Sequence, residues 1–106
     1  MKLLCALLIS ALLLVADPER ATKDPAARED FSIDWSLRTT GGNDIVSSSW
    51  TVPTGITKVS DAATTSTTLI RLSGGTVGKV YRIRNVVTLE DGQILAKTID
   101  IYVDYQ

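Results

Sequence analysis

The sequence KVYRIRNVVTLEDGQILAKTIDIYV, residues 79–103, decides the fold. Apolar and polar side chains alternate through residues 79–89, which places every second residue on the same face of a β-strand. One face is expected to carry Tyr81, Ile83, Asn85, Val87 and Leu89. A second strand is expected from Ile94 to about Val103, and the Asp91-Gly92 pair between the two runs favours a tight type I′ turn. The stretch predicts an antiparallel β-hairpin.

Shorter alternating runs precede this hairpin. Strands are expected over residues 31–38, 45–52, 56–60 and 67–73, with a Thr- and Ser-rich loop at residues 61–66. The side chains expected to face inward are Phe31, Ile33, Trp35, Leu37, Val46, Trp50, Val52, Ile70 and Leu72. Six to seven short strands at roughly 8–12-residue spacing, with no helical period after residue 30, predict an all-β, immunoglobulin-like sandwich of antiparallel strands over residues 31–106. The pattern argues against helices and against a parallel sheet.

Three aromatic residues bear on the core. Trp35 and Trp50 follow the inward parity of their strands, so both are expected in the core rather than as platforms for stacking a ligand. Tyr81 opens the penultimate strand, three residues after Gly78. That position fits either the corner tyrosine of immunoglobulin-like sandwiches, whose phenol bonds to a crossing loop, or an ordinary strand aromatic.

The N-terminal segment, residues 1–16, differs from the rest of the chain. LLCALLISALLLVA, residues 3–16, contains no charge, and a helix of that length spans roughly 21 Å, less than the ~30 Å hydrocarbon core of a membrane. Lys2 followed by this run fits a secretory signal peptide, but a cut after Ala16 would leave Leu14 three residues before the cleaved bond. The alternatives are an uncleaved arm or helix that packs on another subunit, and a lipid-surface anchor.

Residues 17–30, DPERATKDPAARED, are rich in charge and contain two Pro. This composition predicts an exposed linker between the apolar segment and the sandwich.

The composition excludes several kinds of chemistry. The chain has no His and one Cys, Cys5, so it has no Cys/His zinc site, no imidazole base and no disulfide within the chain. Asp34 and Asp100 are the carboxylates nearest to inward positions, but they form no recognisable acid–base pair. The serines at 47–49 have no base to activate them, and the acids at 90–91 lack the spacing of a calcium loop. The sequence therefore predicts no catalytic, cofactor-binding or metal-binding residue.

Charge bears on the partners of the protein. The chain has 11 Lys and Arg against 12 Asp and Glu, a formal net charge of −1, which argues against nucleic-acid binding. Arg71, Arg82 and Arg84 are expected on outward faces of neighbouring strands. They form either an ordinary solvated surface or a weak basic patch for an acidic partner.

Several strings in residues 23–105 resemble the bacteriophage fiber-tail adaptor proteins. The strings are Lys23-Asp24-Pro25, Phe31 with Asp34-Trp35-Ser36, Asp44 through Ile56 with Ser49-Trp50-Thr51-Val52-Pro53-Thr54-Gly55 as the most specific part, Leu72 through Thr76, and Gly78 with Tyr81. The resemblance implies a small immunoglobulin-like sandwich built into the virion, joining the tail or neck to fibers without catalysis. Residues 1–20 depart from the family pattern.

Two functions remain open on the sequence. The first is a non-enzymatic adaptor in the phage virion, present in several copies and bound to tail or neck and fiber subunits, with no nucleic acid as partner. The second is an exported bacterial β-sandwich that binds a partner at the cell envelope, in which case residues 1–16 are a signal peptide. Membrane contact through residues 3–16 is a less favoured possibility.

Overall fold

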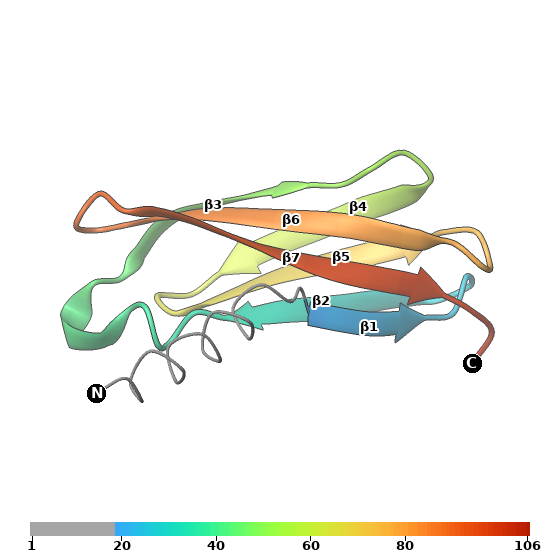
Figure 1. Cartoon of the computed structure of the whole chain (residues 1–106), viewed down its shortest axis with the longest axis horizontal. Coiled ribbons are helices and arrows are strands. Elements are labelled where there is room, and N and C mark those ends of the chain that lie inside the picture. Colours follow the sequence, from blue (N-terminus) through green and yellow to red (C-terminus); the bar gives the residue numbers. More distant parts are fainter. Residues whose placement is uncertain (1–18) are drawn as a thin grey trace, which may run out of the picture.

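The computed structural model describes residues 19–106, which form two β-sheets packed face to face (Figure 1). The seven strands of this part of the chain are β1 (Glu19–Lys23), β2 (Arg28–Asp34), β3 (Ile45–Thr51), β4 (Ile56–Ala63), β5 (Thr67–Gly74), β6 (Val80–Leu89) and β7 (Ile94–Val103), with a short 3-10 turn, η1, at Thr40–Gly42. The large sheet has the order β1-β7-β6-β3, and the small sheet has the order β2-β5-β4. The predicted all-β, immunoglobulin-like sandwich is confirmed.

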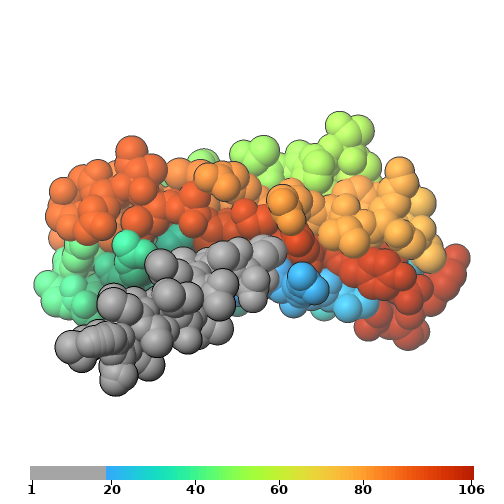
Figure 2. Space-filling view, viewed as in Figure 1, coloured from blue at the N-terminus to red at the C-terminus, as the bar shows by residue number. Residues whose placement is uncertain are grey.

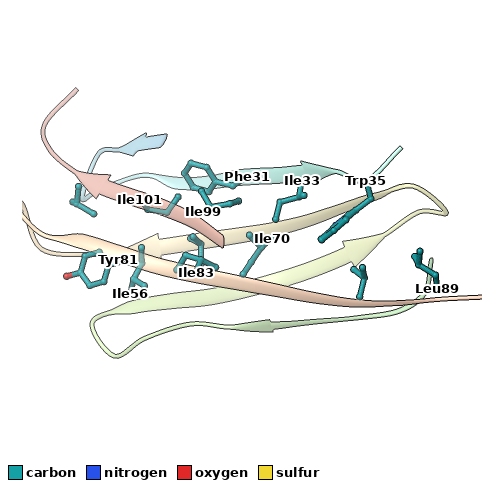
Figure 3. Close-up of a cluster of buried hydrophobic side chains, with 13 residues drawn as sticks. Phe31, Ile33, Trp35, Ile56, Ile70, Tyr81, Ile83, Leu89, Ile99 and Ile101 are labelled. Atoms are coloured by element: carbon teal, nitrogen blue, oxygen red, sulfur yellow. The ribbon is translucent and has the colours of Figure 1, made fainter. Parts of the chain in front are cut away.

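The core lies between the two sheets and is built mainly from the inward positions of the predicted strands. Its fully buried members include Ile33, Ile70, Leu72, Ile83, Val87, Ile101 and Val103, and Figure 3 shows Trp35 and Leu89 toward one end of the cluster and Tyr81 and Ile56 toward the other. Trp35 is buried as predicted. Trp50 is partly buried and packs against the same cluster from β3.

The predicted hairpin is present, but its turn differs from the expected type. β6 and β7 pair antiparallel from Val80 with Tyr102 to Thr88 with Ile94. A type I′ turn needs positive φ at two central residues, and among the described residues only glycines have positive φ. Instead, the Gly92 N–H bonds to the Leu89 carbonyl, and Gly92 at φ 93° takes the bulge position of a three-residue loop.

The linker predicted for residues 17–30 is wrong over most of its length. Glu19–Lys23 form β1, which pairs with β7 in parallel register, and β2 already begins at Arg28. The expectation of purely antiparallel pairing therefore fails at this one pair of strands. A strand of five residues, four of them charged or polar, carries little period-two signal. Ala21 and the buried Lys23 nevertheless alternate with the exposed Arg20 and Thr22, so β1 has one face toward the core.

Three further expectations are corrected. Leu37 is 88% exposed, because β2 ends at Asp34 and the chain turns away. Val46 is 60% exposed, because the register of β3 against β6 shifts between Ile45 and Ser47. The loop expected at residues 61–66 is shorter, since β4 continues through Ala63.

Candidate functional site

A buried polar network crosses the sandwich at the middle of β6. Asn85, which the alternation placed on the apolar face, is fully buried. Its carbonyl oxygen accepts hydrogen bonds from the Trp35 indole N–H at 3.1 Å and the Thr68 hydroxyl at 2.6 Å, and its amide donates to the Ser48 hydroxyl and the Ser49 carbonyl. The network joins both sheets and satisfies the buried polar side-chain groups of Trp35, Thr68 and Asn85.

Tyr81 occupies the position of a corner tyrosine. The loop at residues 75–79, called here the corner, carries the chain from the small sheet to the large sheet. The Thr76 backbone N–H donates to the Tyr81 hydroxyl at 2.9 Å, and hydrogen bonding to the side chain and backbone of Thr76 lowers the pKa of the phenol. Of the two readings left open by the sequence, the structure supports the corner tyrosine.

Two glycines allow the chain to approach this tyrosine. Gly75 has φ 100°, and a Cβ there would lie 2.7 Å from the Val103 side chain. Gly55, in the turn between β3 and β4, has φ 106°, and a Cβ there would lie 3.1 Å from the Tyr81 ring. Substituting Gly75 would therefore force a clash as well as backbone strain, and substituting Gly55 would strain the backbone and crowd the Tyr81 ring.

Lys23 is the buried charge that the sequence did not reveal. Its side chain is fully buried at the end of β1, and its ammonium donates to the Gly74 carbonyl at 2.7 Å and the Asp24 carbonyl at 2.9 Å. Burial lowers its pKa, while the nearby carboxylates of Glu29 and Asp24 oppose that shift. Lys23 thus fastens β1 to the end of β5.

Asp24 ties the same end of the molecule to the C-terminus. Its carboxylate accepts the backbone N–H groups of Ala26 at 2.8 Å and Gln106 at 3.0 Å, and these two bonds lower its pKa. Figure 1 shows the β1–β2, β3–β4 and β5–β6 connections and the C-terminus together at this end of the sandwich. The Lys-Asp-Pro string therefore has a structural role in holding this end closed.

A shallow hollow of about 460 Å³ lies on the outer face of the large sheet. It is lined by Arg20, Ala21, Thr22, Val80, Asp100 and Tyr102, which come from β1, β6 and β7. Figure 2 shows these three strands side by side on one face of the molecule. β1 supplies half of the lining, so the strand that the sequence missed is also the strand that builds this feature.

Cross-strand pairing arranges the hollow in two rows. The first row is Arg20, Asp100 and Arg82, and the second is Thr22, Tyr102 and Val80. Arg82 bonds to both Asp100 oxygens, at 2.9 and 3.1 Å, which lowers the pKa of that carboxyl. Val80 is 60% exposed and Tyr102 is 41% exposed. The hollow therefore combines a charged row with an apolar row.

The arginine patch expected from Arg71, Arg82 and Arg84 is corrected. Arg71 lies on β5 in the other sheet, where it pairs with Asp30 at 2.7 Å. Arg82 and Arg84 share the outward face of β6, and Arg20 joins them from β1. Asp34 and Asp100 face outward, and the Asp34 carboxylate accepts the Ser36 N–H in a local turn.

The four sheet edges differ in their protection against strand addition. β1 and β2 carry charged residues along their length, and β4 has a register shift between Lys58 and Ser60 and an ion pair between Lys58 and Asp61. β3, with the sequence IVSSSWT, contains no charge, and its register against β6 shifts between Ile45 and Ser47. Charge on an edge strand opposes pairing with another chain, so β3 is the one edge of the described sandwich without that protection.

Two searches of the described residues bear on other chemistry. Within residues 19–106, no group of three or more His, Cys, Asp or Glu side chains is placed to hold a metal ion. The same part of the chain has no helix that is long and apolar enough to cross a membrane. Residues 1–16, for which a signal peptide, an arm or an anchor was expected, lie outside the described residues.

Comparison with known proteins adds the family. A family model described as "Podophage GP4 fiber-tail adaptor protein gp77" matches residues 23–102. The chain belongs to this adaptor family. The match begins at the buried Lys23 and includes the corner and half of the residues that line the hollow, and it confirms the resemblance seen in the sequence.

Solved structures support the fold independently. The chain is similar to the PKD domain from KIAA 1837 protein, with a TM-score of 0.53 and 18% sequence identity. The similarity covers 86% of this chain and 84% of that chain, and at this identity it shows the fold alone. No curated protein matches the chain.

Proposed function

We propose that the protein is a non-enzymatic structural component of a phage virion that joins the tail or neck to the fibers. The family match over residues 23–102 carries this proposal. The sandwich is consistent with it, since its polar residues are engaged in closing the fold rather than gathered around a reactive group. The Lys23 and Tyr81 contacts hold one end closed, and the Asn85 network joins the two sheets.

An adaptor needs two separate contact surfaces, and the sandwich offers two. The hollow lies on the outer face of the large sheet, on β1, β6 and β7. The uncharged edge strand β3 lies at the opposite edge of the same sheet. Partners bound at these two places would not compete for the same side chains. Several copies in one particle would strengthen contacts that are weak individually.

The fiber content of particles tests this function. Particles assembled without the protein are expected to contain a complete head and to lack fibers, as judged by electron microscopy and by the protein composition of purified particles. Supplying the purified protein to those particles should restore fiber attachment. Fibers attached in normal number without the protein would contradict the proposal.

For residues 1–16 we propose an arm that is retained and packs on a neighbouring subunit. The support is their uncharged sequence, which needs an apolar surface to cover it. A test deletion must stop at residue 16, because Glu19 and Arg20 belong to β1. Removal of residues 1–16 should abolish incorporation into particles while leaving the sandwich folded. Unchanged incorporation, or an intact mass showing that the segment is cleaved in mature particles, would contradict the arm and favour a signal peptide.

A further inference from the structure

We propose that the outer face of the large sheet, centred on the hollow, docks an acidic segment of another virion protein that carries an apolar side chain beside its carboxylates. The inference rests on the proposed function, which supplies the virion setting. It goes further by naming the chemistry of the partner and the residues that recognise it.

Charge is the first argument. The strand alternation places three arginines, Arg20, Arg82 and Arg84, and one carboxylate, Asp100, on the outer face of the large sheet. On the outer face of the small sheet, the arginines at 28 and 71 are balanced by the aspartates at 30 and 34. Although the chain has a net charge of −1, the outer face of the large sheet therefore carries a local excess of positive charge.

The arginines of this face are not equivalent. Both oxygens of Asp100 are bonded by Arg82, so that pair is already satisfied within the sheet. Arg20 lies in the same cross-strand row, on the far side of Asp100, and is exposed. Its guanidinium is positioned to receive a carboxylate from outside, where a forked, charge-assisted hydrogen bond is strong and directional.

The apolar row is the second argument. Val80 and Tyr102 pair across β6 and β7 directly beside the charged row, and both remain substantially exposed. Tyrosine and arginine are enriched at protein interfaces, where an aromatic ring buries a large area at low entropic cost and a guanidinium binds carboxylates in a forked geometry. A valine and a tyrosine ring next to a hollow offer a place for one apolar side chain.

The spacing of the rows defines what fits. Rows on the same face of a sheet are two residues apart along each strand, which is about 7 Å. A partner segment therefore needs a carboxylate and an apolar side chain about 7 Å apart, as residues i and i+2 of an extended chain provide. An extended segment that carries an acidic residue at i and an apolar residue at i+2, both on the face toward the sheet, meets both requirements.

A peptide titration tests this chemistry without particles. The probe is a short blocked peptide with glutamate at i, leucine at i+2 and serine at the positions between and beside them, added to the isotope-labelled full chain and followed by NMR. The backbone amides of Arg20, Thr22, Val80 and Tyr102 are expected to shift, and versions with glutamine or lysine in place of glutamate should leave them unmoved. Shifts confined to the small sheet, or equal shifts with the lysine peptide, would overturn the proposal.

Matched variants test it on particles. Arg20→Glu reverses a charge in an exposed edge strand at the hollow, and Arg28→Glu makes the same change in an exposed edge strand of the other sheet. Binding to particles assembled without the protein should weaken at least tenfold for Arg20→Glu and less than twofold for Arg28→Glu. Arg20→Gln, which removes the charge without reversing it, serves if the glutamate variant fails to fold.

These experiments distinguish a failure of the docking proposal from a failure of the adaptor function on which it rests. A wild-type protein that fails to bind the particles contradicts the adaptor function, while the peptide titration still decides the chemistry of the face. A wild-type protein that binds while both Arg20 variants bind equally well overturns the inference alone. Binding of duplex DNA that is lost in Arg20→Glu but kept in Arg28→Glu would also overturn it, by assigning the face to phosphate.

Discussion

The ammonium of Lys23 donates to the Gly74 carbonyl at 2.7 Å, a contact that joins two residues 51 positions apart in the chain. Lys23→Met keeps the length of the side chain and leaves the carbonyls of Gly74 and Asp24 without this donor. We expect a loss of about 1–3 kcal/mol in the free energy of unfolding, measured by urea denaturation. The control Lys58→Met removes an exposed ion pair and should cost less than about 1 kcal/mol. Equal effects of the two changes would contradict a structural role for Lys23.

Alanine substitutions at Gly75 and Gly74 distinguish the effect of a steric clash from the effect of backbone strain. Both have positive φ, at 100° and 78°, but only at Gly75 would a Cβ strike a neighbour, 2.7 Å from a Val103 methyl group. Gly74→Ala should destabilise by about 1 kcal/mol through strain alone, and Gly75→Ala by clearly more, in thermal or urea unfolding. Equal stability of the two variants would show that the Val103 side chain can make room for a Cβ at Gly75.

Asn85 is the centre of the buried polar network. Asn85→Ala would leave the Trp35 indole N–H without its 3.1 Å partner and open a small cavity in the core. The expected loss is about 2–4 kcal/mol in unfolding free energy, with an altered tryptophan emission spectrum. Thr88→Ala, on the outward face of the same strand, is the control and should change stability by about 0.5 kcal/mol or less. A stable Asn85→Ala with unchanged emission would show that the network is dispensable.

Much of the fold could be predicted because period-two alternation directly reports a half-buried strand. β6 and β7 are long enough for the pattern to be unambiguous, and Asn85 was placed correctly on the inner face despite its polarity. β1 was missed because five residues, ending in a lysine, look like a charged linker until the Gly74 carbonyl that receives the ammonium is known. Pairing across sequence distance, not local composition, decides such a strand.

The hollow could not be predicted for the same reason. Arg20 and Tyr102 become neighbours only through the parallel pairing of β1 with β7, and no local signal indicates that register. Arg71 was grouped with Arg82 because alternation gives the face of a residue but not the sheet to which its strand belongs.

The ion pairs of Asp30 with Arg71 and of Asp100 with Arg82 should make the stability of the folded protein depend on pH. Arg71 lowers the pKa of Asp30, and Arg82 lowers the pKa of Asp100, in each case mainly through a side-chain hydrogen bond. Because these folded-state pKa values lie below the unfolded value, the stabilisation is complete above about pH 4 and is lost as the pH falls through the folded pKa. Asp30→Asn and Asp100→Asn should therefore lower the melting temperature at pH 7, and the difference from the wild type should shrink as the pH falls below about 4. A difference in melting temperature that is the same at pH 7 and at low pH would assign the effect to packing instead.

The central claim is that this sandwich is a joint in the virion, and electron cryo-microscopy of intact particles tests it most directly. We expect density for the seven-stranded sandwich between the tail or neck and the fiber, with the β1–β6–β7 face against an acidic segment of a neighbouring protein. Fibers joined to the tail by other proteins, with no density for this sandwich, would contradict it.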